Sequence, residues 1–414
     1  MAIVRPFKGI RPIKELVDKV AALPYDVMNT EEAREMVKDN PYSFLHVDKA
    51  QIDLPASINQ YDEIVYNTAR GNLDKMRADG TYIQDSAPSM YVYRQIMDGR
   101  VQTGIVACTS IDDYMNSIIK KHENTRSEKE KDRINHVDYC NANTGPIFLT
   151  YRNVGEIDDI VSKYTSREPE YNFVSEDGIS HIIWVINDTD TVKRLEELFK
   201  GVEYLYIADG HHRAASAVNV GRMRREANKN YTGDEEFNFF LSVIFPADDL
   251  YIMDYNRVVK DLNGNSSEEF LGKIRNKFNI EEYAGERQYK PEGKSMIGMY
   301  LDGKWYKLTA KEGTYDPADP VKSLDVSILQ ENVLTPILGI DDPKTSDRID
   351  FVGGIRGLEE LERRVQEGMK IAFAMYPTSI EELMNIADEG KLMPPKSTWF
   401  EPKLRSGIFV HELV

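Results

Sequence analysis

Cysteine is scarce in this sequence, which contains only Cys108 and Cys140 among its 414 residues. So few cysteines exclude the disulfide framework of a small secreted domain and favour a reducing compartment. The sequence does not exclude a single disulfide between the two. Long apolar runs are absent too. No stretch approaches the roughly 20 residues of a membrane-spanning helix, and the start, MAIVRPFKGIRPIKE, lacks a signal-peptide core. We therefore expect a cytoplasmic protein without a membrane partner.

Basic residues are in the minority. The chain carries 52 Lys and Arg against 69 Asp and Glu, a formal net charge of −17. This balance weighs against binding to nucleic acid, which attracts clustered positive charge, but it permits a local basic pocket for a phosphorylated ligand. With 41% hydrophobic and 29% charged residues over this length, the composition predicts a globular protein of more than one domain. It leaves the oligomeric state open.

Several catalytic signatures are missing. The sequence contains no G-x-x-x-x-G-K-[ST] phosphate loop, no G-x-S-x-G nucleophile elbow and no H-E-x-x-H metal helix. His122-Glu123 lacks the second histidine of that helix, and the glycines of residues 353–357 lack the spacing of a dinucleotide-binding turn. By their usual signatures, P-loop enzymes, α/β-hydrolases and zinc proteases are therefore excluded.

The strongest positive signal is residues 202–215, VEYLYIADGHHRAA. Alternating aromatic and β-branched residues over 202–208 predict a strand, and Asp209-Gly210 predicts a tight turn. The alanine-rich sequence of residues 214–228 predicts a helix. The free N–H groups at the start of a helix attract anions, so this junction is a candidate phosphate site.

The side chains of the turn favour the same interpretation. The guanidinium of Arg213 offers a fork of donors suited to phosphate oxygens. His211 and His212 are two of only seven histidines in the chain. Adjacent histidines diverge, so both rarely bind one metal ion, though one of them could join Asp209 and a distant ligand. The plain alternative is a charged surface turn.

A second polar cluster lies within residues 120–138, KKHENTRSEKEKDRINHVD. It contains His122-Glu123 with Thr125, and then Asp132-Arg133. Alone, such a charge run is typical of a solvated face or loop. Phosphoryl transfer, however, needs cations around the phosphates and a carboxylate that orients or deprotonates the accepting hydroxyl. Together, the two clusters supply both.

The remaining sequence alternates strand and helix signals. Asp98-Gly99 and Asp302-Gly303 each predict a β-hairpin. The strand-rich core extends to about residue 260, so we expect domains at 1–260 and 261–414. Strands or hairpins are expected over 90–97, 101–111, 147–151, 181–187, 239–245, 251–259 and 296–308, and helices over 30–39, 57–78, 266–278, 324–334 and 357–368.

Short ordered matches to a known family run along nearly the whole chain. They are Leu23-Pro24-Tyr25-Asp26-Val27, Asn40-Pro41-Tyr42, His122-Glu123 with Thr125, Lys131-Asp132-Arg133, Ala142-Asn143, Gly145-Pro146-Ile147-Phe148, His181, Trp184, residues 207–213, Ala387-Asp388, residues 393–398, Phe400, Pro402-Lys403 and Ser406-Gly407. On these residues the chain resembles the bacterial and archaeal family called domain of unknown function 1015. That family is similar to the superfamily of partition protein ParB, sulfiredoxin and the free serine kinases.

The resemblance implies an α+β fold, with a ParB/sulfiredoxin-like mixed sheet and helices in the core and an α+β extension at the C-terminus. It implies ATP or ADP and Mg²⁺ as cofactors, and a small-molecule substrate. The serine kinases carry an Asp-Gly-His-His-Arg turn and an earlier His-Glu pair whose glutamate activates the serine hydroxyl. The resemblance implies that Gly210, His211, His212 and Arg213 bind phosphate, that Glu123 and Asp209 are catalytic, and that Asp209 binds magnesium. It implies substrate-binding or supporting roles for His122, Thr125, Asp132, Arg133 and Arg257.

One departure concerns residues 254–257. Relatives generally show Pro-x-His-Arg, whereas this chain reads Asp-Tyr-Asn-Arg, so Asn256 cannot transfer a proton, while Arg257 could still contact an anion. Sulfiredoxin chemistry is disfavoured because its reactive cysteine is replaced by His211.

The leading hypothesis is a nucleotide-dependent phosphotransferase acting on a small hydroxyl compound such as free serine. The alternatives are a ParB-like nucleotide-binding regulator and a metal-dependent phosphoesterase. Lys396-Ser397-Thr398 is either a substrate lid or a docking strand.

Overall fold

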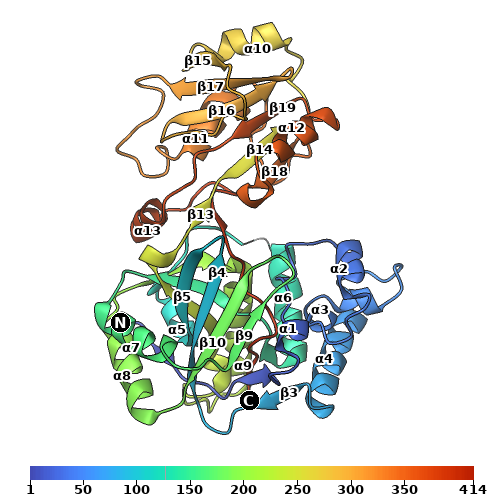
Figure 1. The fold of residues 1–414 in the computed structure, drawn as a ribbon, viewed down its shortest axis with the longest axis vertical. Helices are drawn as coiled ribbons and strands as arrows, with labels where there is room; N and C mark the ends of the chain where they lie inside the picture. Colours follow the sequence, from blue (N-terminus) through green and yellow to red (C-terminus); the bar gives the residue numbers. More distant parts are fainter. Residues whose placement is uncertain (126) are drawn as a thin grey trace. The chain divides into compact units, whose positions relative to one another are not determined.

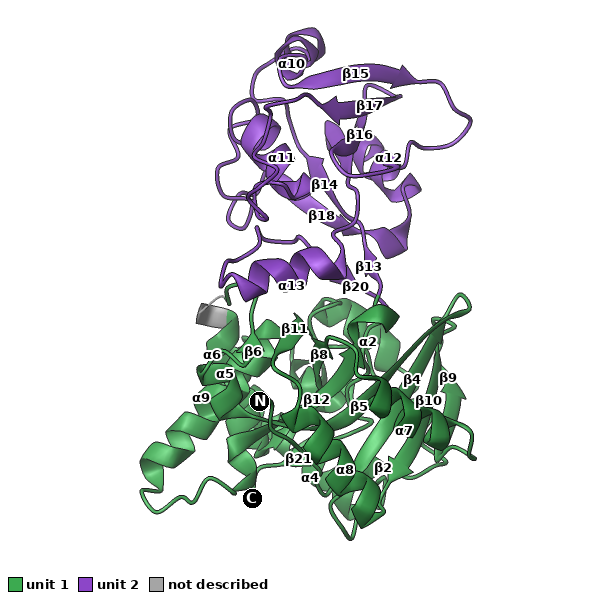
Figure 2. Cartoon of the chain, turned by 90° about the vertical axis from the view of Figure 1, so that its left-hand side faces the viewer, with its two compact units in different colours: residues 1–250, 402–414 green, residues 251–401 purple. Residues whose placement is uncertain are grey.

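The computed structural model describes residues 1–125 and 127–414, and the chain divides into two compact units (Figure 2). Unit 1 comprises Met1–Leu250 and Pro402–Val414, and unit 2 comprises Tyr251–Glu401. These bounds differ from the expected 1–260 and 261–414 because strand pairing joins distant segments. Strand β14 (Tyr255–Val259) pairs within unit 2, and β21 (His411–Glu412) pairs with β7 (Ala142–Asn143) of unit 1.

A mixed β-sheet forms the centre of unit 1 (Figure 1). The strand order is β6-β11-β8-β12-β5-β4-β10-β9, with β1 paired to β5. The pairs β11–β6 and β12–β8 are parallel and the other pairs of this sheet are antiparallel. The strands are β1 Val4–Arg5, β4 Met90–Met97, β5 Arg100–Ser110, β6 Ile119–Lys120, β8 Ile147–Tyr151, β9 Tyr171–Val174, β10 Ser180–Ile186, β11 Leu205–Asp209 and β12 Phe239–Pro246.

Helices cover this sheet and build a second apolar cluster beside it. The larger core joins alternate strand residues, such as Ile147, Leu149 and Tyr151 of β8, to α7, α8 and α9. The smaller cluster gathers residues of α2, α3 and α4. The helices of unit 1 are α1 Val17–Val20, α2 Thr30–Val37, α3 Leu45–Asp48, α4 Glu63–Ala78, α5 Ile111–Met115, α6 Ser127–Cys140, α7 Gly155–Thr165, α8 Thr189–Lys200 and α9 His211–Ala227, and β2 (Ile10–Pro12) pairs with β3 (Tyr82–Gln84). The expected α+β class with a mixed sheet is confirmed.

Unit 2 has its own sheet, with strand order β15-β17-β16-β19-β14-β18. Helices accompany it, so the expected α+β character of the C-terminal part is confirmed. The additional elements are α10 Ser267–Ile274, β15 Phe278–Tyr283, β16 Met296–Leu301, β17 Lys304–Ala310, α11 Asp325–Leu329 with a π-helical turn Gln330–Leu334, β18 Ile349–Gly353, α12 Glu359–Gln366, β19 Ile371–Ala374, α13 Ile380–Asp388, and the pair of β13 Ile252–Met253 with β20 Trp399–Phe400.

Several local predictions are confirmed by backbone geometry. Asp98 and Gly99 have φ values of 51° and 78° in the β4–β5 hairpin, as a two-residue turn with both central residues left-handed requires. Asp302 and Gly303 repeat this pattern between β16 and β17, with φ values of 50° and 78°. The helix expected over 30–39 begins at Thr30, where Asn29 caps it in a reciprocal capping box with Glu32.

Other expectations need correction. The helix expected from 57 begins at Glu63, because Asn59 and Asp62 form side-chain bonds to backbone N–H groups in the preceding turns. The helix expected over 266–278 ends at Ile274, since Phe278 already pairs in β15. Cys108 and Cys140 are both buried and free, so they form no bridge. Among the described helices, none combines the length and apolarity needed to span a bilayer.

Candidate functional site

The expected strand–turn–helix junction is present, and its helix begins at His211 instead of at 214. Strand β11 ends at Asp209, and Gly210 follows as the N-cap with φ 91° and ψ 32°. A Cβ at Gly210 would be strained at this φ and would lie 3.2 Å from Nε of Arg213. The first amide that donates within α9 is that of Ala214, to the carbonyl of Gly210 at 2.9 Å. The three preceding amides therefore have no intrahelical acceptor and can meet an anion.

Asp209 stands at the mouth of this turn. Its Oδ1 accepts a hydrogen bond from the Gly210 amide at 2.9 Å, and its Oδ2 pairs with Nζ of Lys403 at 3.2 Å. Burial alone would raise the pKa of the carboxyl. The positive charges of Lys403 and Arg213 outweigh that effect and hold the pKa of Asp209 well below its usual range. Asp209 is therefore a carboxylate, and its side chain is 34% exposed.

Arg213 folds back over the turn. Its Nη1 donates to the carbonyl of Pro146, just before β8, at 2.5 Å. A Cβ at the neighbouring Gly145 would lie 3.5 Å from the same Nη1, so the guanidinium passes close to bare backbone. This anchoring fixes the position of a cation beside the free amides of α9.

Two buried histidines meet at the same place. Parallel pairing of β6 with β11 brings His122 beside the turn, where its ring and that of His211 contact edge to face, with centroids 4.4 Å apart. Both side chains are buried, and Nδ1 of His122 and Nε2 of His211 have no hydrogen-bond partner among the residues that the structure describes. Burial lowers the pKa of His122 to about 4 and that of His211 well below its usual value. Both imidazoles are neutral at physiological pH.

One ring nitrogen of His122 is left for a ligand. Burial keeps the imidazole neutral, so one of its two nitrogens carries the proton and the other holds a lone pair. Among the described residues Nδ1 has no hydrogen-bond partner, so it can donate to a ligand or accept from one, according to the tautomer.

Glu123 and Thr125 follow His122 in the segment that leads to α6. Glu123 is half-buried. The hydroxyl of Thr125 donates to Oε2 of Glu130 at 2.5 Å, and the side chain of Asn219 in α9 donates to Oε1 of the same Glu130 at 2.8 Å. Through Glu130, Thr125 thus ties this segment to α6 and α9.

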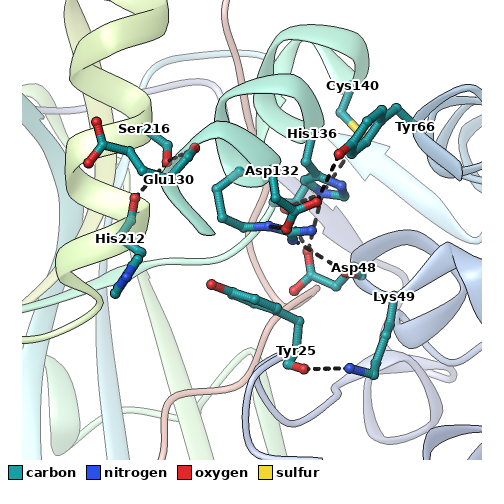
Figure 3. Close-up of polar contacts among 12 residues, drawn as sticks. Tyr25, Asp48, Lys49, Tyr66, Glu130, Asp132, His136, Cys140, His212 and Ser216 are labelled. Carbon is teal, nitrogen blue, oxygen red and sulfur yellow. Dashed lines mark hydrogen bonds and ion pairs between the residues drawn. The ribbon is translucent and has the colours of Figure 1, made fainter. Parts of the chain in front are cut away.

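The solvated charge run expected over 120–138 is wrong for its second half. Asp132 and Arg133 lie in α6 and are each only 9% exposed. Arg133 Nε pairs with Asp132 Oδ2 at 2.8 Å, Tyr66 donates to Asp132 at 3.0 Å, and the Arg133 guanidinium lies 4.1 Å from the ring centroid of Tyr25 (Figure 3). Charges in this stretch are satisfied by N-terminal residues that the local sequence pattern cannot reveal.

A further buried cluster contains His136 and Asp48, whose backbone carbonyl accepts from Arg133 at 3.4 Å (Figure 3). Thr144 donates to Asp48 Oδ1 at 2.7 Å, and His136 Nε2 lies 3.5 Å from the same oxygen. Burial lowers the pKa of His136, but Cys140 and Asp48 outweigh it and raise the value to about 9. Arg213 also lines this small cavity of about 20 Å³, which has room for roughly one water. The cavity is too small for a nucleotide, so it supports the site rather than forming it.

A magnesium ion at Asp209 is not favoured by the side chains as they stand. Both carboxylate oxygens are already engaged, one by the Gly210 amide and one by Lys403. Within the described residues, no group of three or more His, Cys, Asp or Glu side chains could hold a metal ion. We therefore assign no step to a metal.

Apart from Glu123 and Thr125 in the segment before α6, the predicted residues fall into three places. Asp209, Gly210, His211, His212 and Arg213 form one turn, with His122 in direct contact. Arg133 lines the neighbouring cavity with Tyr25 and Asp48. Asp132 pairs with Arg133 and accepts a hydrogen bond from Tyr66. Arg257 belongs to unit 2, where Asn256 accepts from the Met375 amide at 2.8 Å and so serves the backbone.

Sequence reasoning gave no role to two residues that the site uses. Lys403 pairs with Asp209, which lies 194 residues earlier in the chain. The carboxylate of Asp48 accepts a hydrogen bond from Thr144 and lies close to His136. Lys403 stands in the matched stretch Pro402-Lys403, which was the available signal. Asp48 lies outside every matched stretch, so no motif pointed to it.

Comparison with known proteins gives a match to one family model and low-scoring matches to solved structures. A search of curated proteins gave no match. A conserved hypothetical protein from Pyrococcus furiosus aligns with a TM-score of 0.37 and 14% identity over 74% of this chain and 95% of that chain. A free serine kinase in complex with AMP aligns with a TM-score of 0.38 and 14% identity over 74% of this chain and 91% of that chain. SbnI with C-terminal truncation from Staphylococcus aureus aligns with a TM-score of 0.40 and 12% identity over 74% of this chain and 87% of that chain.

These TM-scores are too low to transfer a function. The sequence match is of a different kind, because residues 4–327 of the 414 fit the profile of the family described as "Protein of unknown function (DUF1015)". This match spans the strand–turn–helix junction, the His122-Glu123 segment and α6. The chain therefore belongs to the DUF1015 family.

Proposed function

We propose that this chain is a nucleotide-dependent phosphotransferase that moves a phosphoryl group onto the hydroxyl of a small molecule, with free serine as the first acceptor to test. The observation that carries the proposal is the pair of buried nitrogens without partners, Nδ1 of His122 and Nε2 of His211, at the start of α9. Buried polar atoms in folded proteins are nearly always hydrogen-bonded, so such a pair suits groups that are completed by a ligand.

The phosphates of ATP or ADP would lie against the beginning of α9. The amides of residues 211–213 have no intrahelical acceptor and point outward from a 17-residue helix. Arg213 and Lys403 supply two positive charges at the same turn. Preorganised cations and amides of this kind stabilise the charge of a transferring phosphoryl group.

The accepting hydroxyl would meet His122 and Glu123. In the tautomer that carries its proton on Nε2, Nδ1 of His122 accepts a hydrogen bond from an O–H group, which a neutral hydroxyl compound provides. The carboxylate of Glu123 takes the hydroxyl proton as the oxygen–phosphorus bond forms and the terminal P–O bond of the donor breaks. Because both orphaned nitrogens are buried, the side chains that cover them must move when the ligand enters.

Calorimetric titration of the full chain with ATP and ADP, with and without Mg²⁺, tests nucleotide binding. Phosphate transfer to serine and to a panel of other hydroxyl compounds then tests catalysis. Binding and transfer together support the proposal, and tight binding without transfer to any acceptor favours the ParB-like nucleotide-binding regulator. Metal analysis of the purified protein tests the phosphoesterase alternative, for which a tightly held metal is expected. Folded protein that binds neither nucleotide would overturn the phosphotransferase.

A further inference from the structure

Unit 2 contains an arginine whose charge has no acidic partner. Arg257 lies in β14, is 3% exposed, and packs 5.6 Å from the ring centroid of Phe351 on the neighbouring strand. Its Nη1 donates to the carbonyl of Tyr255 and its Nη2 to that of Lys396 at 2.8 Å. Among the described residues no carboxylate forms an ion pair with it. Burying a charge without a counter-ion is costly, and burial accordingly lowers the pKa of Arg257 to about 10.

Arg257 lines a cavity of about 220 Å³. Its volume is below the roughly 300–1,000 Å³ of sites for drug-sized ligands, so its ligand must be small. Apolar side chains line it, among them Val326, Leu334 and Phe351. Two exposed acids, Asp341 and Asp342, line it as well.

One wall of the cavity comes from the segment that contains Lys396-Ser397-Thr398. Pro394 lines the cavity, and its carbonyl accepts from the hydroxyl of Ser397 at 2.6 Å. The hydroxyl of Thr378 donates to the Ser397 carbonyl at 3.0 Å. Lys396 has a φ of 61°, uncommon for a residue with a side chain, and in this position its carbonyl accepts from Arg257. The segment is thus docked within unit 2 and fixes both the cavity and the arginine.

We propose that this cavity binds a small monocarboxylate with a short apolar chain, and that the ligand carboxylate is the missing counter-ion of Arg257. Arginine pairs with carboxylates through parallel N–H···O bonds, and Arg257 keeps N–H groups beyond the two that donate to backbone carbonyls. The apolar wall covers the hydrocarbon part of the ligand. Asp341 and Asp342 repel multiply charged anions such as phosphate esters. Every residue named here belongs to unit 2.

The same chemistry is offered by a free carboxylic acid and by an apolar amino acid. The two sources differ by an ammonium group, which would be attracted to Asp341 and Asp342. The probes are therefore 4-methylpentanoate, L-leucine, isopentylamine, which lacks the carboxylate, and inorganic phosphate, each titrated calorimetrically into the full chain without nucleotide. Binding of 4-methylpentanoate or L-leucine, but not of isopentylamine or phosphate, is expected. Preference for L-leucine identifies the amino acid source.

Variants link the binding to the cavity. Arg257→Met and Arg257→Lys should weaken binding roughly 10- to 100-fold, because the bidentate pair is lost. Arg287→Ala, at an exposed arginine of the same unit, is the control and should bind normally. If the Arg257 variants do not fold, Asp341→Asn at the exposed rim decides: it should tighten binding of 4-methylpentanoate by a few-fold. Absence of binding by both carboxylates, or binding that neither Arg257 nor Asp341 affects, would overturn the proposal.

Discussion

Replacing Arg213 with alanine is the most direct test of the phosphate site. In the free protein the guanidinium makes one hydrogen bond to the Pro146 carbonyl at 2.5 Å and lies over Gly210. A hydrogen bond that involves a charged group contributes about 1.5–3 kcal/mol. If the same guanidinium contacts a phosphate, Arg213→Ala should weaken nucleotide binding by a similar free energy, which corresponds to roughly a 10- to 100-fold loss of affinity.

The assay must separate this loss from unfolding. Arg213→Ala also removes the bond to Pro146, so the free energy of unfolding should fall by about 1–3 kcal/mol, which leaves a chain of this size folded. Urea denaturation and calorimetric titration with ATP measure the two effects on the same sample. Arg222→Ala, at an exposed arginine of the same helix, is the matched control and should change neither quantity. Folded Arg213→Ala that binds nucleotide with wild-type affinity would refute the placement of phosphate at this turn.

Three further predictions follow from the same unit. At saturating nucleotide, Glu123→Gln should lower kcat by roughly 10²–10⁴-fold at unchanged affinity, while the exposed Glu203→Gln should not; equal rates would show that Glu123 is not the base. Gly210→Ala should lower the free energy of unfolding by about 1–2 kcal/mol, because Gly210 has a φ of 91°. Gly71→Ala, inside α4 with no neighbour near the added Cβ, should raise it by about 0.5–1 kcal/mol. Changes of the opposite sign in urea denaturation would contradict this explanation. In the folded protein the pKa of His136 is raised from 6.5 to about 9. Protonated His136 should therefore contribute stability on the order of 3 kcal/mol, complete below pH 6.5 and lost as the pH rises through 9. If the unfolding free energy of His136→Asn keeps the same dependence on pH, the assignment is wrong.

The sequence by itself determined those features that depend on neighbouring residues. Asp98-Gly99 closes a hairpin because both positions must adopt positive φ, which few residues tolerate. Asn29 begins a helix because its side chain reaches the amide three residues on. The Asp209–Arg213 turn belongs to the same class: a strand, a left-handed glycine and a helix follow one another, and the free amides of the helix start come with them.

Only the tertiary structure decided which charges are buried and what they contact. The alternating acids and bases of residues 120–138 predict a solvated run. Asp132 and Arg133 are nevertheless buried, because Tyr66, Tyr25 and Asp48 contact them from the N-terminal part of the chain. Lys403 reaches Asp209 across 194 positions of the chain, and His122 reaches His211 through the parallel pairing of β6 with β11. Arg257 likewise gains its cavity only when β14 pairs within unit 2. Burial and long-range charge pairing depend on the closure of large loops, and no local pattern of residues encodes which partner a buried charge will meet.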